Sequence, residues 1–382
     1  MTDFSRTIVY VGYYDTLSNH AENRGYVPSA TSKMDYILEV LRRLSFNVQV
    51  VSASQTRSRR GYSGKEVLLS GGHKLLLFRT LPWGGRVRRV TSRAFTSMHV
   101  LLWLLLNTAS DETVLVYHSL AYSTPIALAQ RLRSFRLILE VEEIYADVTG
   151  RKRDRRRESR VFRAACAFVL PTPLLVDAIG AGERPYAIVH GTYAIEPRLK
   201  SRFDDGKIHV VYAGTFDPRK GGAAAAVAAA EFLSERYHVH IIGFGTECDK
   251  QSLLNLIEEI QRTATCVVTY DGLLVGRDYV EFLQRCDIGL STQTPDAEFN
   301  DTSFPSKVLS YMSNGLRVVS IRLKALEDSR VGDLLYYYDD DSPQAIASAI
   351  QRVDFDDRYD SRARLMRLDD EFARALEEVL CG

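Results

Sequence analysis

The chain contains the sequence Phe304-Pro305-Ser306-Lys307-Val308-Leu309-Ser310-Tyr311-Met312-Ser313-Asn314-Gly315, and the apolar run Val318-Val319-Ser320-Ile321 follows it. A proline near the start and a glycine at the end are typical of helix boundaries, and the apolar run is typical of a buried strand. The first backbone amides of such a helix, with Lys307 in its first turn, suit a phosphate group. This stretch therefore predicts an anion site and a nucleotide-linked substrate.

The composition is that of a soluble protein with two domains. Of its 382 residues, 46% are hydrophobic and 25% are charged, which is ordinary for globular proteins and sufficient for two cores. Five cysteines without paired spacing argue against a disulfide framework, and the sequence shows no close Cys/His cluster. The amino terminus leads directly into a predicted strand, so we expect no signal peptide. Together with the unpaired cysteines, this favours a protein of the reducing cytoplasm.

Charge is divided unequally along the chain. Residues 1–200 hold 29 Lys and Arg against 17 Asp and Glu, whereas residues 201–382 hold 20 against 31. The basic residues gather at 57–60, 86–93 and 151–157, and an anionic membrane surface would attract such clusters. Nucleic acid is not an expected partner, because no recognition motif accompanies them. The apolar run 98–106 is too short to span a bilayer and predicts either a core helix or an interfacial segment for peripheral attachment.

Segments typical of strands and of helices alternate along the chain. The predicted strands are 8–11, 48–51, 113–117, 137–141, 208–214, 239–242, 266–270, 288–290, 318–321 and 334–338. The predicted helices are 32–44, 125–132, 223–234, 250–263, 278–285, 305–315 and 344–352. This order predicts an α/β fold with two doubly wound, Rossmann-like domains that face a cleft. We expect the domains at 1–195 and 208–358, a linker at 196–207, and a helix within 359–382 that can cross back to the N-terminal domain.

Five motifs after residue 207 follow one another in the order of a known family. They are 211–221, 242–245, 270–273, 286–291 and the helix 305–315. In this order they resemble the donor-binding half of GT-B glycosyltransferases, especially the large family 4 (group 1) and its relatives. The N-terminal half matches that family only in architecture. The resemblance implies a GT-B fold, a nucleotide sugar bound by the C-terminal domain and an acceptor bound by the N-terminal domain.

The resemblance also implies which residues bind the donor. Lys220 takes the place of a lysine that the family brings onto the diphosphate, while Thr215 stands where the family often has an arginine, for which Arg219 can compensate. The Gly-x-Gly turn at 243–245 would pack against the nucleotide base, and the loop at 272–273 would supply backbone contacts to it. The expected donor-binding residues are Gly214, Thr215, Arg219, Lys220, Gly243, Gly245, Gly272, Leu273, Ser306, Lys307 and Ser310.

The helix motif departs from the common pattern of the family. Many members have two glutamates here, and the corresponding positions hold Thr302 and Ser310. Ser310 can accept a hydrogen bond from a ribose hydroxyl, although more weakly than a carboxylate. Ser306 and Lys307 resemble instead a Pro-Ser-Lys variant found in a branch of bacterial polysaccharide glycosyltransferases, in which the serine and the lysine would hold the diphosphate.

Candidates for catalysis on the acceptor side follow predicted strands of the N-terminal domain. They are Glu143, His118 and Asp15, which we expect to line the cleft. An inverting enzyme needs one such group as its general base, whereas a retaining enzyme can act without one.

The resemblance implies a metal-independent glycosyltransferase (a hexosyltransferase), with the retaining class favoured. A UDP-sugar is the favoured donor, and a saccharide or lipid-linked oligosaccharide in surface polysaccharide synthesis is the expected acceptor. Two alternatives stay open: a nucleotide-sugar epimerase on the same scaffold, and a non-catalytic GT-B partner subunit of another transferase. Loss of the glutamates favours the partner subunit, and the retained lysines argue against it.

Overall fold

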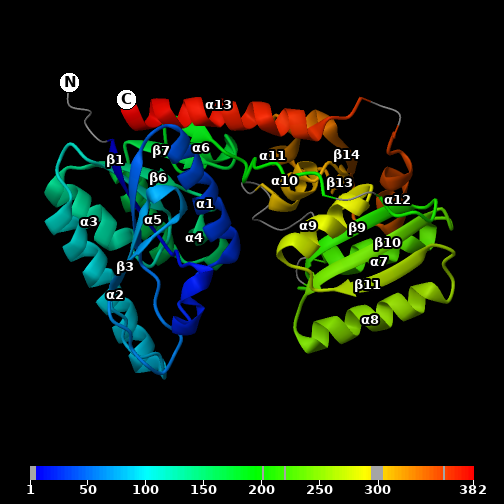
Figure 1. The fold of residues 1–382 in the computed structure, drawn as a ribbon, viewed down its shortest axis with the longest axis horizontal. Helices are drawn as coiled ribbons and strands as arrows, with labels where there is room; N and C mark the ends of the chain where they lie inside the picture. The colour runs from blue at the N-terminus through cyan, green and yellow to red at the C-terminus, as the bar shows by residue number, and fades with distance from the viewer. Residues whose placement is uncertain (1–5, 200–201, 219–220, 294–303, 356–357) are drawn as a thin grey trace. The chain divides into compact units, whose positions relative to one another are not determined.

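The computed structural model describes residues 6–199, 202–218, 221–293, 304–355 and 358–382. The chain divides into two compact units, the first comprising residues 1–192 and 371–382 and the second comprising 193–370. Each unit contains a sheet of mainly parallel strands, with helices packed against it (Figure 1).

The sheet of the first unit has the strand order β3-β4-β2-β1-β5-β6-β7-β8. β3 pairs antiparallel with β4, and the other neighbouring pairs are parallel. The strands are β1 (Thr7–Gly12), β2 (Asn47–Ser52), β3 (Lys65–Leu68), β4 (Lys74–Leu77), β5 (Thr113–Tyr117), β6 (Arg136–Glu140), β7 (Ala167–Leu170) and β8 (Tyr186–Ile188). The central strands are buried apolar runs, as expected for a sheet that helices cover.

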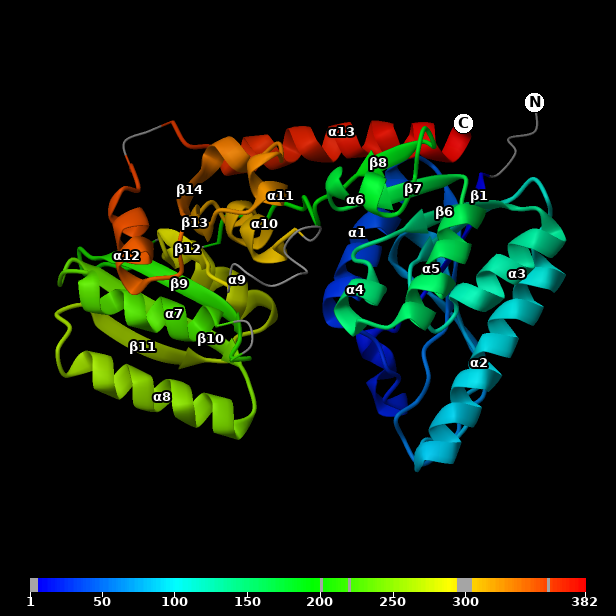
Figure 2. The same ribbon diagram turned by 180° about the vertical axis from the view of Figure 1, so that it is seen from behind.

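Helices cover both faces of this sheet (Figure 2). They are α1 (Pro28–Arg43), α2 (Arg86–Asn107), α3 (Ser123–Arg133), α4 (Tyr145–Thr149), α5 (Lys152–Ala164) and α6 (Leu174–Ala178), with 3-10 turns at Leu17–Glu22 and Ser70–Gly72. α3 lies between α2 and α5 and packs against both. Their buried residues form one core with alternate residues of the strands, including Val9 and Val11 of β1, Val100 of α2, Ile126 of α3 and Phe162 of α5.

The sheet of the second unit is parallel throughout its described strands and has the order β11-β10-β9-β12-β13-β14. The strands are β9 (Ile208–Thr215), β10 (Tyr237–Phe244), β11 (Val267–Gly272), β12 (Ile288–Ser291), β13 (Arg317–Ile321) and β14 (Leu335–Tyr338). The chain winds outward from β9 to β11 and then returns to the other side of β9 with β12. The topological switch point therefore lies between β9 and β12, and ligands of doubly wound sheets bind at the carboxyl ends of the strands there.

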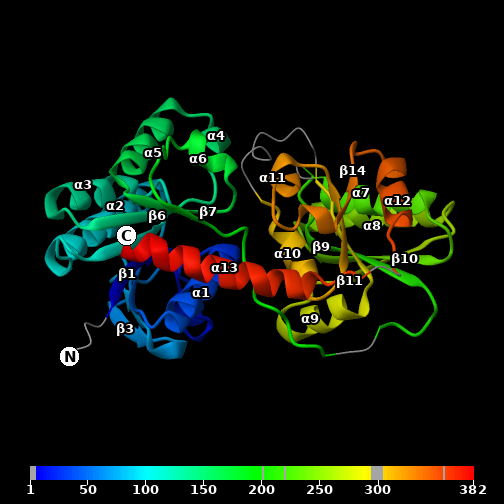
Figure 3. The ribbon, with the colours of Figure 1, turned by 90° about the horizontal axis from the view of Figure 1, so that it is seen from above.

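Two layers of helices enclose the second sheet. The helices are α7 (Gly222–Ala229), α8 (Glu247–Gln261), α9 (Gly276–Arg285), α10 (Ser306–Ser313), α11 (Lys324–Glu327) and α12 (Pro343–Gln351), with 3-10 turns at Ala230–Phe232 and Gly332–Leu334. α7 packs between α8 and α12 on one face. Figure 3 shows α9 on the opposite side of β9, β10 and β11 from α7 and α8. α10 packs against β12 and β13.

The predicted α/β fold with two doubly wound sheets is confirmed. The strands β3, β4, β7 and β8 were not among the predicted strands. The basic stretch 151–157, for which no element was predicted, is mostly helical because it forms the first turns of α5. The apolar run 98–106 is helical and is the second half of the longer helix α2.

The last helix, α13 (Ser361–Cys381), begins in the second unit and belongs to the first unit from Glu371 onward. Arg136 of β6 donates hydrogen bonds to the carbonyls of Val379 and Leu380, at 2.7 and 2.6 Å. Phe372 stacks on Tyr36 of α1. The end of α13 is thus part of the packing of the first unit.

Within the described residues, no helix has both the length and the apolar character needed to cross a membrane.

Candidate functional site

At the switch point of the second unit, one tyrosine bridges the diverging ends of β9 and β12. β9 and β12 pair only from Ile288 opposite Val210 to Gly289 opposite Val211. Beyond that point the hydroxyl of Tyr311, on α10, accepts a hydrogen bond from the Ala213 amide at 2.9 Å and donates one to the Leu290 carbonyl at 3.2 Å. Tyr311 is completely buried. Its hydroxyl therefore replaces the missing ladder bonds and fixes α10 against the diverging ends of both strands.

Helix α10 brings Lys307 to the carboxyl end of β9. The Lys307 ammonium lies over the ring of Tyr212, 3.9 Å from its centre. A Cβ atom added to Gly214 would lie 2.5 Å from Lys307 Nζ, so a larger residue at position 214 would displace the lysine from this place. The motif helix begins at Ser306, and its N-cap residue Pro305 has no side-chain group that could cap the first amides. A helix start of this kind, beside an ammonium group, attracts anions.

The Gly-x-Gly turn lies beside the same strand end. The Gly243 backbone has φ = 138°, and a Cβ there would overlap the Gly214 carbonyl oxygen. The Phe216 amide donates a hydrogen bond to the Phe244 carbonyl at 2.9 Å, which joins the loops that follow β9 and β10. A Cβ on Gly245 would lie 2.9 Å from Phe216 Cβ. Close backbone packing therefore explains both glycines without a ligand, although it also leaves the backbone accessible.

The remaining donor-side predictions are placed as follows. Thr215 ends β9, and its carbonyl accepts a hydrogen bond from the Tyr212 hydroxyl at 3.1 Å. Ser310 shares a hydrogen bond of 3.1 Å with the Tyr279 hydroxyl. Gly272 has φ = 86°, and the Leu273 side chain after it is exposed. Ser306 is exposed at the start of α10. Arg219 and Lys220 lie outside the described residues, as does Thr302.

A second helix start faces this region. α7 begins at Gly222, after Gly221 in the left-handed conformation, and no side chain caps it. Thr292, which follows β12, donates a hydrogen bond to the Gly222 carbonyl at 2.7 Å. α7 and α10 thus both begin beside the carboxyl ends of β9 and β12. Their combined dipoles make this edge of the sheet electropositive.

The acceptor-side candidate His118 is buried in the first unit. Its Nε2 lies 2.9 Å from a carboxylate oxygen of Glu158, and only 2% of the side chain is exposed. The Glu158 carboxylate also accepts hydrogen bonds from the backbone amides of Tyr145 and Ala146, both at 2.8 Å. In this arrangement His118 and Glu158 connect the end of β5 to the start of α4 and the middle of α5. Its ring supports that corner of the unit.

Asp15 lies in the loop after β1 and is also buried. Its carboxylate accepts hydrogen bonds from the Asn19 amide group, at 3.0 and 3.1 Å, and from the Thr16 backbone amide at 2.9 Å. Burial raises the pKa of Asp15 above its ordinary value, although these hydrogen bonds oppose the shift. Asp15 lines a cavity of about 520 Å³ between this loop, α1 and β3, together with Tyr14, Asp35 and Glu39. Carboxylates and phenols are groups that can bind sugar hydroxyls.

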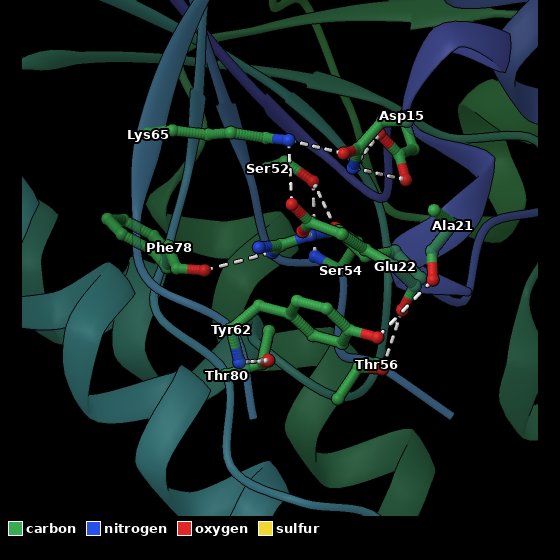
Figure 4. A network of polar contacts seen from close by, with 12 residues as sticks. Asp15, Ala21, Glu22, Ser52, Ser54, Thr56, Tyr62, Lys65, Phe78 and Thr80 are labelled. Atoms are coloured by element: carbon green, nitrogen blue, oxygen red, sulfur yellow. Dashed lines mark hydrogen bonds and ion pairs between the residues drawn. The ribbon is translucent and has the colours of Figure 1, made fainter. Parts of the chain in front are cut away.

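A network of charged groups fixes the loop that carries Asp15 (Figure 4). The Glu22 carboxylate pairs with Lys65 of β3 at 2.6 Å and with Arg24 at 2.7 Å. Arg24 also donates to the Phe78 carbonyl at 2.9 Å, and Thr56 donates to the Glu22 carbonyl at 2.6 Å. Arg24 and Glu22 are mostly shielded from water. The ion pair with Lys65 holds the loop against β3, and the hydrogen bonds of Arg24 and Thr56 hold it against the segments that follow β4 and β2.

Glu143 lies in the segment between β6 and α4 and is half-buried. Its neighbour Glu142 forms an ion pair with Lys33 of α1. The Lys33 ammonium also donates to the Val189 carbonyl at 3.2 Å. The carboxyl end of β6 is therefore a charged region of the first unit, and Glu143 follows this strand end.

Glu140, the last residue of β6, is a buried acid that the sequence analysis did not identify. It is completely buried, and one of its carboxylate oxygens accepts a hydrogen bond from the Tyr10 hydroxyl, while the other has no hydrogen-bond partner among the described residues. Burial raises the pKa of Glu140 to about 8; the charge of Glu142 adds to the shift and that of Lys33 opposes it. The sequence feature that could have identified this buried acid is a glutamate directly after the apolar run Leu137 to Leu139.

Replacing Tyr311 by phenylalanine should destabilise the second unit. The Ala213 amide and the Leu290 carbonyl would lose their shared partner in a buried place, which costs about 1–3 kcal/mol in the free energy of unfolding. Urea unfolding of Tyr311→Phe measures this, with Tyr186→Phe, at a half-exposed site of β8, as the control. Equal stability of the two variants would contradict this role of Tyr311.

Glu140→Gln should remove a pH dependence of stability. The folded state keeps Glu140 protonated up to about pH 8, whereas the unfolded chain ionises it near its ordinary value of 4.5. The free energy of unfolding of the wild type should therefore fall as the pH rises between these values. Relative to the wild type, Glu140→Gln should gain stability between about pH 5 and about pH 8.5. Urea titrations at both pH values test this, with exposed Glu66→Gln as the control; a difference that stays constant with pH would contradict it.

Comparisons with known proteins agree with this geometry. Residues 207–354 match the family model described as "Glycosyl transferases group 1". No curated protein matches the chain significantly in sequence. Solved structures with a similar fold include the UDP-forming α,α-trehalose-phosphate synthase of Burkholderia xenovorans, with TM-score 0.66, 12% identity and 99% of each chain covered.

Two further structures have the same fold. The lipopolysaccharide outer core galactosyltransferase WaaB has TM-score 0.65 and 13% identity, with 97% of this chain and 99% of that chain covered. HepE of Anabaena, solved with UDP and glucose, has TM-score 0.63 and 11% identity, with 98% and 100% covered. The chain thus has the GT-B fold over nearly its whole length, and its second unit carries the group 1 glycosyltransferase domain of a transferase enzyme.

Proposed function

We propose that the protein transfers a hexose from a nucleotide diphosphate sugar, with a UDP-sugar favoured, to a hydroxyl of a saccharide or lipid-linked oligosaccharide. We further propose that it acts in surface polysaccharide synthesis and retains the anomeric configuration. One observation carries the proposal: the Lys307 ammonium lies against Gly214 at the switch point, at the start of a helix without a side-chain cap. The diphosphate of the donor would bind there.

Glycosyl transfer needs positive charge at this place. As the bond between the sugar and the diphosphate breaks, negative charge develops on the leaving group, and preorganised cations and amides stabilise it. Lys307 and the first amides of α10 and α7 would supply this stabilisation, assisted by Arg219 and Lys220 of the loop before α7. On this proposal the chemistry requires no divalent metal. Ser306 and Ser310 would add hydrogen bonds to the phosphates and the ribose.

The comparisons support the choice of donor and acceptor. The trehalose-phosphate synthase is named as UDP-forming, and HepE was solved with UDP and glucose. WaaB is named as a galactosyltransferase of the lipopolysaccharide outer core, which supports a surface saccharide as the acceptor. The family model covers the second unit, where the predicted donor residues lie.

On the acceptor side we propose that sugar hydroxyls bind near Asp15 and Glu143 in the first unit. The cavity lined by Asp15 offers several carboxylates and phenols for a saccharide. His118 would act through its contact with Glu158 and not as a base, since its Nε2 is engaged. This arrangement is compatible with a retaining reaction, in which no general base is required.

We also propose that the first unit attaches peripherally to an anionic membrane surface on the cytoplasmic side. α2 buries Ser92, Thr96, Val100 and Leu104, so its opposite side is exposed. That side combines basic and apolar side chains: Arg86, Val87, Arg88, Arg89, Val90, Arg93, Met98, Leu102 and Leu106. The basic helix α5 belongs to the same layer through α3. Such a surface can insert apolar groups among lipids while its arginines contact headgroups.

Lys307→Ala should weaken binding of UDP and UDP-sugars by about 10- to 100-fold, because a charge-assisted hydrogen bond to the diphosphate is lost. Calorimetric titration with UDP measures this, and Lys324→Ala, an exposed lysine at the start of α11, is the matched control. Unchanged binding by Lys307→Ala would contradict the proposed site. A wild-type protein that binds no nucleotide sugar would be a partner subunit, and one that converts the donor without an acceptor would be an epimerase.

Binding to lipid vesicles should require anionic lipid and should fall as salt is added, since salt screens the arginines of α2 and α5. Co-sedimentation with vesicles of phosphatidylcholine, with or without phosphatidylglycerol, measures it. The double variant Leu102→Ser with Leu106→Ser should bind less than Leu68→Ser, an equally exposed apolar site on β3. Binding that is absent, or that salt does not change, would remove the membrane proposal.

A further inference from the structure

Three histidines meet on one face of the second sheet, away from the proposed donor site. His209 lies near the start of β9, and His238 and His240 lie near the start of β10. His209 and His238 are register partners, and His240 is two residues farther along, so all three side chains point to the same face. One ring nitrogen from each lies within 4.8 Å of the others. His209 and His240 are buried, and His238 is half-buried.

The outer nitrogens of the two buried rings contact carboxylates. His209 Nε2 lies 2.8 Å from a carboxylate oxygen of Asp205, and His240 Nδ1 lies 3.0 Å from one of Asp271. A carboxylate can only accept a hydrogen bond, so the outer nitrogen of each ring carries the proton and donates it.

This assignment leaves two lone pairs facing each other. His209 Nδ1 and His240 Nε2 are 2.8 Å apart, and both are acceptors when the rings are neutral. Two acceptors at this distance repel, so either a proton or a metal ion is needed between them. A neutral imidazole whose outer N–H is bonded to a carboxylate is the usual form of a metal-ligating histidine. The surroundings support such a site: Phe203 stacks on both rings, and Thr269 donates a hydrogen bond to Asp271 at 2.9 Å.

We propose that His209, His238 and His240 bind one divalent transition-metal ion, with zinc as the best-suited ion, and that Asp205 and Asp271 orient the two buried ligands. Three imidazoles form a known zinc ligand set, which leaves one coordination position for water. Nitrogens that share a zinc ion are about 3.3 Å apart, so the two facing nitrogens must separate by about 0.5 Å. His238 stacks on His240 with ring centres 3.9 Å apart, and its Nε2 lies 3.1 Å from the Thr269 hydroxyl. Its side chain must therefore rotate to turn a nitrogen toward the ion. The half-exposed His238 side provides the route from solvent.

The site would be structural. Its ligands lie at the amino ends of β9 and β10, whereas the proposed donor loops follow their carboxyl ends. Asp205 precedes β9, so the ion would connect the entry to this strand with β10. The inference does not depend on the proposed function, and it requires no change in nucleotide binding.

The test uses the full chain, freed of any polyhistidine tag and dialysed against a chelator. Calorimetric titration with zinc chloride should give one site per chain, with a dissociation constant below about 1 μM. His238→Ala should abolish this binding, and Asp271→Asn should weaken it by about 10- to 100-fold. His99→Ala, at a half-buried histidine of α2, is the control and should bind zinc normally. Far-ultraviolet circular dichroism checks that each variant is folded.

Cobalt titration distinguishes this site from the exposed cysteines Cys166, Cys248 and Cys381. Cobalt bound by imidazoles should give visible absorption of a tetrahedral or five-coordinate ion without a thiolate charge-transfer band. Zinc should also raise the melting temperature of the wild type and of His99→Ala but not of His238→Ala. The proposal is overturned if the wild type takes up no stoichiometric metal, in which case the two rings share a proton, or if His238→Ala binds metal as the wild type does.

Discussion

The geometry of the second unit depends on the hydroxyl of Tyr311. It joins β9 to β12 exactly where their backbone ladder ends, by accepting from Ala213 and donating to Leu290. A Cβ on Gly289 of β12 would overlap the Tyr311 ring, so this contact also requires the glycine at that position. Without this contact the strand ends would expose unpaired backbone groups in the core, and α10 would lose its fixed position.

The position of α10 determines the chemistry of the site. Lys307 precedes Tyr311 by one helical turn, so the buried tyrosine places the lysine over Gly214. The second constraint is the close approach of Gly243 to the Gly214 carbonyl, which joins the ends of β9 and β10. Both constraints act on the same strand end. A doubly wound sheet thereby presents an ammonium group and two helix starts at its switch point, and these are the groups that a diphosphate needs.

Much of this could be predicted from the sequence, because it is local. Helix α10 was expected at 305–315 and is Ser306–Ser313, and the alternating apolar segments gave both sheets. What was missed depends on contacts between distant residues. The short strands β7 and β8 have few residues to show a pattern, and the buried carboxylate of Glu140 is recognisable only once Tyr10 and Lys33 surround it. His209 and His240 are 31 residues apart in sequence, so their contact follows from strand pairing. The motif His238-Val239-His240 within a strand was the available signal.

Hydrogen–deuterium exchange of the full chain, with and without UDP, tests the central claim most directly. The account predicts that UDP slows exchange of the backbone amides at the start of α10 and in the loops after β9 and β10. The segments around His209 and His238, at the opposite ends of these strands, should exchange unchanged. Protection confined to the first unit, or no protection at Ser306 to Val308, would contradict the account.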